Sequence, residues 1–140
     1  MTVNEKTNVT WTDRDDAIAA ALFRSVRTTD QLLAAGLFGT RRRAQARLST
    51  LRQAGWLEQR RYRRSIEKGN SFYYQLTLRG FRQWRSEPNA RPPTRRFFAE
   101  IAEPHHHHAY DLARLWTATE QFAAATGYRI GPVQPEGSFA

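Results

Sequence analysis

The residues with the clearest chemistry lie in one short stretch, TRRRAQARLSTLRQAG, at residues 40–55. Each arginine guanidinium is a planar fork of donors that fits phosphate oxygens or the O6 and N7 atoms of guanine. A glutamine amide can pair with N6 and N7 of adenine, and an alanine methyl group can contact the methyl group of thymine. The stretch therefore carries side chains suited to binding a polyanion and to distinguishing base edges.

A second candidate group is the run of four histidines at residues 105–108, in EPHHHHAY. On a helical projection His105 and His108 fall on one side, whereas the other two point elsewhere, so the four imidazoles cannot converge on one ion. A metal site would need this pair with Glu103 or Asp111 as a third ligand, and the HEXXH spacing of zinc hydrolases is absent. We expect a helix start with no metal and no cofactor, and keep His105 and His108 as the alternative.

The positive charge is concentrated in the middle of the chain. The net charge is +9, but the balance is −1 over residues 1–40, +13 over residues 41–96 and −3 over residues 97–140. Twenty of the twenty-two basic residues are arginine. This distribution predicts a polyanionic partner, and double-stranded DNA above all. RNA is the lesser alternative, because an α-helix cannot read the deep, narrow groove of A-form RNA.

Composition excludes several other classes of protein. The chain has no cysteine, which removes disulfides, thiolate zinc sites and cysteine nucleophiles. No run approaches the ~20 apolar residues of a membrane span, and the first residues lack the pattern of a signal peptide. Without a glycine-rich phosphate loop or a GxSxG motif, we expect a protein that is not an enzyme. We expect it in the cytoplasm, associated with the nucleoid and not with a membrane.

Capping threonines and hydrophobic periodicity place the elements that carry these residues. Thr12, Thr28, Thr40 and Thr77 each precede a segment of helical character, where a threonine side chain accepts a hydrogen bond from the first turn. Next, WLEQRRYRR and SFYYQLTL are rich in aromatic and branched residues and flank turn chemistry in SIEKGN, which predicts a β-hairpin. The expected helices span residues 13–26, 29–35, 41–54 and 78–84.

Helix, short helix, helix, hairpin and helix is the order of a winged helix-turn-helix. We therefore predict a mainly α fold with a small β-hairpin, a winged helix-turn-helix followed by a C-terminal amphipathic helix. The stretch SEPNARPPTRR, with its three prolines, is expected to be a linker without regular structure. The expected parts are a flexible N-terminus at 1–11, a winged-helix DNA-binding domain at 12–86, a proline- and arginine-rich linker at 87–103, the C-terminal helix at 104–126 and a tail at 127–140.

The predicted third helix has an inward line, a reading face and two flanks. Ala44, Leu48 and Leu51 fall on one line that must pack inward. The opposite face carries only side chains that can contact base edges, and the flanks carry groups placed to meet phosphates. The predicted base-reading residues are Arg42, Gln45, Ala46 and Ser49, and the predicted backbone contacts are Thr40, Arg41, Arg43, Arg47 and Arg52.

The hairpin adds a second basic element, which we expect to lie along the DNA backbone or in the minor groove. A basic helix face is usually only a solvated surface. Here the basic residues fall on the third helix and the hairpin together, the two surfaces that dock on DNA in this architecture, which favours DNA binding. The predicted wing contacts are Arg60, Arg61, Arg63, Arg64 and Lys68.

The last predicted helix is amphipathic, with an apolar stripe that needs a partner. It can pack back onto the domain or pair with a second copy of the chain, and both can hold for one helix. We favour a homodimer, because aromatic side chains are typical interface anchors and many DNA readers are two-fold dimers. The predicted dimerisation residues are Leu112, Leu115, Trp116, Thr119 and Phe122.

The chain also resembles a known family. The run RRRAQARLSTLRQAGWLEQRRY, followed by FYYQLTLRG, resembles the winged-helix signature of MarR-like and PadR-like regulators. With TTDQLLAAGLF and HHHHAYDLARLW added, it resembles the replication-relaxation family over about residues 12–126. The resemblance implies DNA binding through Arg41, Arg42, Arg43, Gln45 and Arg47, and a link to DNA replication or relaxation in plasmids and mobile elements. Longer relatives continue past the last helix, so an activity housed there is not implied for this chain.

Three functions follow from these residues. The first is sequence-specific binding to double-stranded DNA by a regulator of transcription or of plasmid and mobile-element replication. The second is an adaptor that recruits a replication or relaxase partner through the last helix. The third is a metal-dependent nuclease that uses the histidines or the acids near residue 13. We expect the first.

Overall fold

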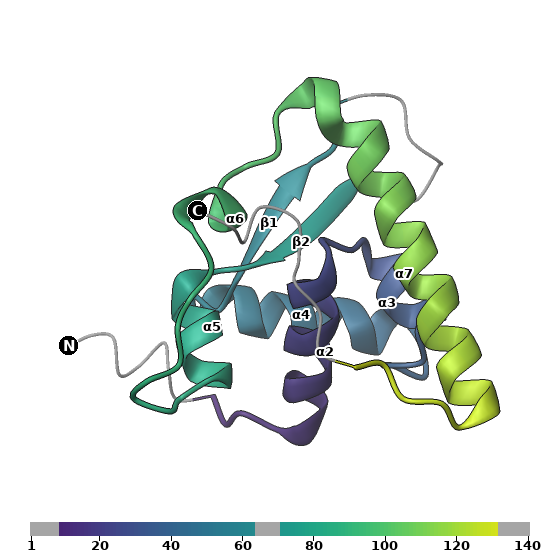
Figure 1. Cartoon of the computed structure of the whole chain (residues 1–140), viewed down its shortest axis with the longest axis horizontal. Helices are drawn as coiled ribbons and strands as arrows, with labels where there is room; N and C mark the ends of the chain where they lie inside the picture. Colours follow the sequence, from purple (N-terminus) through teal and green to yellow (C-terminus); the bar gives the residue numbers. More distant parts are fainter. Residues whose placement is uncertain (1–8, 64–70, 132–140) are drawn as a thin grey trace.

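The computed structural model describes residues 9–63 and 71–131. Within these residues the chain is mainly helical, with six α-helices and one two-stranded antiparallel hairpin, which confirms the predicted class at this level. In chain order (Figure 1) the elements are α2 (Asp13–Arg24), α3 (Thr29–Ala34), α4 (Arg41–Gln53), β1 (Leu57–Arg61), β2 (Phe72–Leu76), α5 (Leu78–Trp84), α6 (Arg95–Phe98), the 3-10 turn η1 (Glu103–His105) and α7 (His106–Thr126).

The four predicted threonine caps are confirmed. Thr12, Thr28, Thr40 and Thr77 each accept a hydrogen bond from the backbone amide three residues later, with donor to acceptor distances of 2.9–3.3 Å. α2 ends at Arg24, two residues before its predicted end. The reason is tertiary, because Ser25 is extended and Arg27 forms a β-bridge with Tyr74.

The predicted hairpin is present as β1 and β2. They pair in a register that runs from Leu57 opposite Leu76 to Arg61 opposite Phe72. The turn predicted in SIEKGN, together with the wing residues Arg64 and Lys68, lies outside the described residues.

The main core lies between α2, α3, α4 and one side of the hairpin. Ile18, Leu22, Leu32 and Leu76 are at most 1 % exposed, and full burial of such a side chain stabilises the fold by roughly 1.5–3 kcal/mol. The predicted inward line of α4 is confirmed. Its members Ala44, Leu48 and Leu51 are all buried.

The predicted linker is more ordered than expected. It contains one turn of helix, α6, whose aromatic residues turn inward: the Phe97 ring centroid lies 5.5 Å from that of Phe23, and Phe98 packs against the main core. The Gln75 side-chain amide donates to the carbonyl oxygens of Phe97 and Ala99 at 3.0 and 2.9 Å. The expectation of a linker without regular structure is therefore wrong for residues 95–98, because the two phenylalanines pack against α2 and the core while Gln75 of β2 holds the backbone.

α7 begins one residue after η1 and runs alongside α3 at one side of the molecule (Figure 1). Gly127, with φ of 79°, ends it in the left-handed conformation that glycine adopts most readily. No helix in the described part of the chain has both the length and the hydropathy that a membrane crossing requires.

The packed face of α7 differs from the predicted stripe. Its buried residues are two alanines, a histidine, a threonine and one tyrosine, whereas the predicted stripe lies at the side or outside. Periodicity did not predict this side because its partners are distant in sequence: Thr117 bonds to Arg27, and His106 bonds to Arg63. The buried residues of α7 are His106, Ala109, Tyr110, Ala113 and Thr117.

Candidate nucleic-acid interface

The outward face of α4 carries the four residues predicted to read base edges. Arg42, Gln45 and Ala46 are exposed and Ser49 is half-buried. Their positions follow from the burial of the opposite side of α4, since a helix that buries one line must present the residues half a turn away. The face has hydrogen-bonding groups and one methyl group, and no large apolar side chain.

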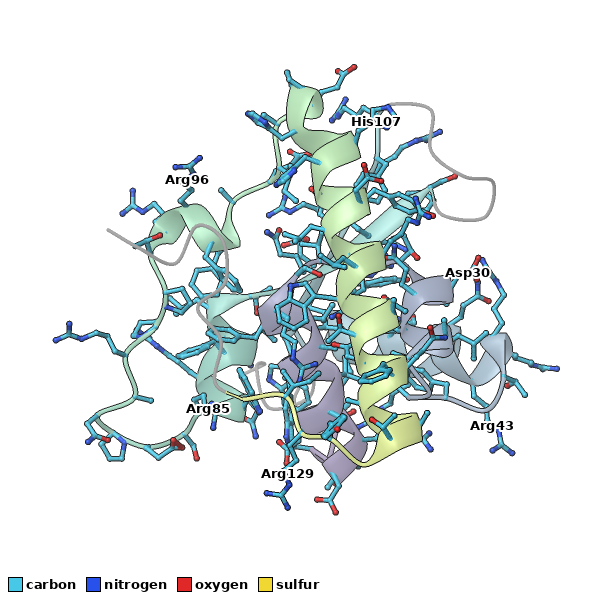
Figure 2. All side chains as sticks on the ribbon, turned by 45° about the vertical axis from the view of Figure 1, so that its right-hand side comes forward. Asp30, Arg43, Arg85, Arg96, His107 and Arg129 are labelled. Carbon is cyan, nitrogen blue, oxygen red and sulfur yellow. The ribbon has the colours of Figure 1, made fainter. Side chains whose placement is uncertain are left out.

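The start of α4 presents three of the predicted backbone contacts. The Thr40 hydroxyl accepts from the backbone amide of Arg43 at 3.2 Å, so it acts as the helix cap. Arg41 is paired with the Asp30 carboxylate at the start of α3. Arg43 is exposed and its side chain points away from the rest of the molecule (Figure 2). All three residues are exposed, and of the two arginines Arg43 is the one without a carboxylate partner in the described part of the chain.

Arg47 has a structural partner, contrary to its predicted role as a phosphate contact. Its guanidinium forms an ion pair with the carboxylate of Asp15, which is fully buried, and donates to the Thr10 carbonyl oxygen at 2.8 Å. The hydrogen bond to Asp15 raises the pKa of Arg47 despite the opposing effect of burial. Arg47 therefore ties α4 to α2, and the prediction missed this because Asp15 is 32 residues away.

The described basic residues of the hairpin and the end of α4 divide into anchored and exposed groups. The Arg60 guanidinium donates to the Gln75 side-chain oxygen at 2.7 Å and to the Phe98 carbonyl oxygen at 3.3 Å, so it holds the α6 segment. Arg52 is bonded to Gln59 of β1.

Arg61 and Arg63 are the exposed members of that group. The Arg61 guanidinium lies 5.7 Å from the centroid of the Phe72 ring, and Arg63 is 3.8 Å from the Glu100 carboxylate. The side chains of Arg61 and Arg63 are both exposed to solvent, as a contact with phosphate requires.

The histidine run has one buried member, and it is not one of the predicted pair. His106 is fully buried, whereas His105 and His108 are exposed. The backbone amide of Arg63 donates to Nδ1 of His106 at 2.9 Å, and Nε2 lies 2.8 Å from the Ile101 carbonyl oxygen. His106 thus joins the end of the hairpin to the start of α7. The described residues contain no cluster of three histidines or carboxylates placed to bind a metal ion.

The predicted dimerisation stripe remains on the surface of α7. Leu115 is 64 % exposed and Phe122 is 59 % exposed, with the Tyr128 ring stacked on Phe122. Leu112 is half-buried and Thr119 is exposed. The half-buried Trp116 lies against Arg24, whose guanidinium carbon is 5.9 Å from its ring centroid. Two large apolar side chains, Leu115 and Phe122, therefore remain largely exposed within the described part of the chain, although Tyr128 covers one side of the Phe122 ring.

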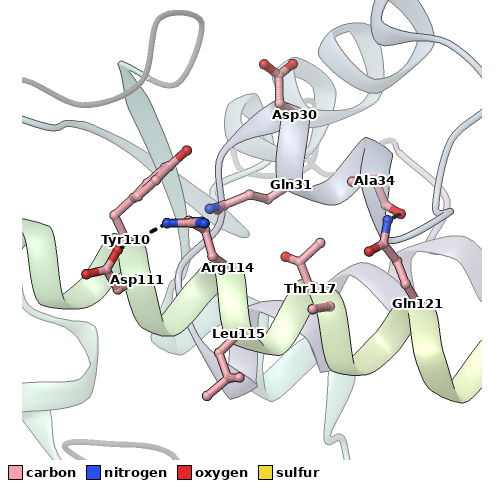
Figure 3. A pocket seen from close by; sticks show the side chains of 10 residues that line it. Asp30, Gln31, Ala34, Tyr110, Asp111, Arg114, Leu115, Thr117 and Gln121 are labelled. Carbon is pink, nitrogen blue, oxygen red and sulfur yellow. Dashed lines mark hydrogen bonds and ion pairs between the residues drawn. The ribbon is translucent and has the colours of Figure 1, made fainter.

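An open groove of ≈ 790 Å³ separates part of α7 from α3. Figure 3 shows the side chains of Gln31 and Arg114 approaching each other from its two walls. At one end the Gln121 side chain donates to the Ala34 carbonyl oxygen at 2.9 Å, so α7 is anchored to the end of α3. Leu115 is the one predicted dimerisation residue in its walls.

The sequence-based prediction missed the residues that fix α7 in place. Arg27 is fully buried, and its guanidinium donates two hydrogen bonds of 2.6 Å to the two carboxylate oxygens of Glu120. These residues are 93 positions apart, and neither belongs to a local pattern. No local pattern in the short connection Ser25–Thr28 distinguishes Arg27 from the exposed arginines.

Comparison with protein-family models, with curated proteins and with solved structures gives no match to this chain.

Proposed function

We propose that the chain binds double-stranded DNA as a winged helix-turn-helix protein, with α4 in the major groove and the hairpin as its wing. The observation that carries the proposal is the outward face of α4, where Arg42, Gln45 and Ala46 are exposed opposite a fully buried line. These side chains match the donor and acceptor patterns of base edges. Such binding suits a regulator of transcription or replication, with a binding and not a catalytic role.

The proposed phosphate contacts are fewer than the sequence predicted. Arg43 and Arg61 are exposed and have no carboxylate partner among the described residues. Arg47 and Arg60 are engaged inside the protein, and we do not include them. The two remaining arginines lie on either element of the proposed interface, Arg43 at the start of α4 and Arg61 on the hairpin.

Selection of bound sequences from random duplex DNA tests the proposal. A preferred motif is expected, and Arg42→Ala is expected to relax the preference at one base position by about 1–3 kcal/mol. Arg43→Ala is the matched control, because loss of a phosphate contact weakens preferred and random duplexes alike and reduces the salt slope by about one. Equal weakening of both duplexes by Arg42→Ala would show that this residue does not read bases.

We further propose that α7 joins two copies of the chain through Leu115 and Phe122. The support is their exposure, 64 % and 59 %, on a helix whose other side is already packed. Large apolar side chains in an exposed patch are typical of an interaction site. A two-fold dimer would present two reading helices to two half-sites.

Leu115→Arg tests the dimer by sedimentation and by DNA binding. The expected result is a monomer with weakened binding to a two-half-site duplex. Ala124→Arg is the control. Ala124 is exposed and lies on the side of α7 opposite Leu115, so this substitution should change neither property. A Leu115→Arg protein with unchanged mass and affinity would reject the dimer and favour an adaptor role for this face.

A further inference from the structure

We propose that the chain has a second DNA-binding surface, separate from α4, which holds the phosphate backbone of another duplex segment. The surface is formed by α5, α6 and the chain between them, and we call it the α5–α6 arginine surface. This inference rests on the proposed function in one respect: α4 is taken to bind the first duplex. The surface comprises Arg79, Arg82, Arg85, Arg91, Arg95 and Arg96.

All six arginines are exposed, and their charge is not neutralised locally. In residues 9–63 and 71–131, none of the six lies within ion-pair distance of a carboxylate. The sequence between residues 78 and 96 contains a single acid, Glu87. By contrast, Arg41 and Arg47 of α4 are paired with Asp30 and Asp15. The α5–α6 arginine surface thus carries more uncompensated charge than the start of α4.

The fold holds this surface in place. Phe97 and Phe98 anchor α6, and the Arg60 and Gln75 side chains bond to its carbonyl oxygens. Arg85 lies over the Trp84 ring, with 4.2 Å between the guanidinium carbon and the ring centroid. Because the backbone is fixed before binding, less conformational entropy is lost when the arginines meet their partner.

The chemistry of the surface fits a duplex backbone better than other anionic partners. A guanidinium can form two parallel hydrogen bonds to one phosphate. Single-stranded nucleic acid needs exposed rings on which bases stack, whereas the rings of α5 and α6 are buried or half-buried, and Trp84 is packed against Phe23 and Phe81. Firm membrane binding adds inserted apolar side chains to the charges, and the buried centre of a protein interface is more apolar than its rim. Leu78, at 38 % exposure, is the one large apolar side chain exposed on α5 or α6.

The position of the surface points to a second duplex segment. A recognition helix enters the groove with its N-terminal residues deepest, so side chains packed at its C-terminal end lie far from its deepest contacts with that duplex. α5 starts there, because the Thr77 hydroxyl donates to the carbonyl oxygen of Gly55, just after α4, at 2.8 Å. Arg85 and Arg96 lie at the opposite edge of the molecule from Arg43 (Figure 2).

A two-duplex retention assay tests this inference. A duplex with the sequence selected for α4 is fixed to beads, and a labelled duplex of unrelated sequence is added with the full chain. The wild type is expected to retain the labelled duplex. Arg82→Gln/Arg95→Gln/Arg96→Gln is expected to lower retention at least about tenfold, since three phosphate contacts are lost. Its affinity for the immobilised duplex should stay within about twofold of the wild type.

The control changes the same amount of charge elsewhere. Arg14→Gln/Arg114→Gln/Arg129→Gln removes three exposed positive charges outside the surface and should leave retention unchanged. Thermal unfolding confirms that both triple variants are folded. If selection yields no preferred sequence, two duplexes of unrelated sequence are used, so that failure of base reading by α4 is recorded separately.

Four results would overturn the inference. If the wild type retains no labelled duplex, the surface does not bind a second duplex. Retention by the α5–α6 triple variant would place the second duplex on another part of the chain. A lower salt slope of this variant for a single duplex would place the arginines on the same duplex as α4. Retention of phosphatidylserine vesicles in place of the labelled duplex would make the partner a membrane.

Discussion

At the scale of single residues, Tyr62 stands out because its hydroxyl is buried without a hydrogen-bond partner among the described residues. Its ring packs against Tyr73 and His106, with centroid distances of 4.7 and 5.3 Å. The Tyr73 hydroxyl, by contrast, accepts from the backbone amide of Ile101 at 3.2 Å. Two neighbouring tyrosines therefore differ in whether the hydroxyl is satisfied.

Phenylalanine substitutions should separate the two tyrosines. Tyr62→Phe is expected to raise the free energy of unfolding by about 1 kcal/mol, because it removes an unsatisfied buried hydroxyl and keeps the ring. Tyr73→Phe should lower it by about 1 kcal/mol, because the Ile101 amide loses its acceptor. Urea unfolding measures both, and a loss of stability in Tyr62→Phe would indicate a partner for its hydroxyl.

From the burial of Tyr62 we predict that stability falls at alkaline pH. Burial raises the pKa of Tyr62 above its ordinary value, with smaller contributions from Tyr73 and Tyr110. The folded state therefore keeps the phenol proton where the unfolded chain loses it, and stability falls as pH rises above about 10. Tyr62→Phe should reduce this alkaline loss. An identical slope in the variant would assign the loss to other groups.

At the scale of elements, Arg47 connects α4 to α2 through its ion pair with Asp15. Arg47→Ala would leave the buried Asp15 carboxylate without its counter-charge, so we expect a loss of about 2 kcal/mol of stability. Arg43→Ala, three positions after the cap Thr40, should change stability by less than about 0.5 kcal/mol and weaken DNA binding instead. Unfolding and DNA affinity measured on both variants check the assignment, which fails if Arg47→Ala keeps full stability.

The sequence predicted interactions between residues close in the chain and missed interactions between residues far apart in it. Thr40 and Thr77 cap helices through bonds to residues three positions away, so local sequence was enough to place them. The packed side of α7 depends on Arg27, Thr117 and Glu120, which meet only in the folded chain. His106 likewise bonds to Arg63, 43 residues earlier. Helical periodicity reports where apolar residues gather and not which of them the fold covers.

At the scale of the whole molecule, the buried pair of Arg27 and Glu120 joins α7 to the rest of the fold. Glu120→Gln is expected to cost about 3 kcal/mol of stability, because a buried guanidinium loses its counter-charge. Asp111→Asn is the control on the same helix: its pair with Arg114 is exposed, with a separation of 3.7 Å, and should contribute little. Chemical unfolding measures both, and equal small effects would mean that water reaches Arg27.

The bridge between Arg27 and Tyr74 has a further consequence for how the molecule opens. The backbone of Arg27 exchanges two hydrogen bonds with Tyr74 of β2, at 3.3 and 2.7 Å, while its side chain holds α7. Separation of α7 would leave a charge buried beside β2, so the hairpin loses protection in the same event. Amide hydrogens of α7 and β2 should therefore exchange with solvent as one cooperative unit, at one common rate-limiting opening.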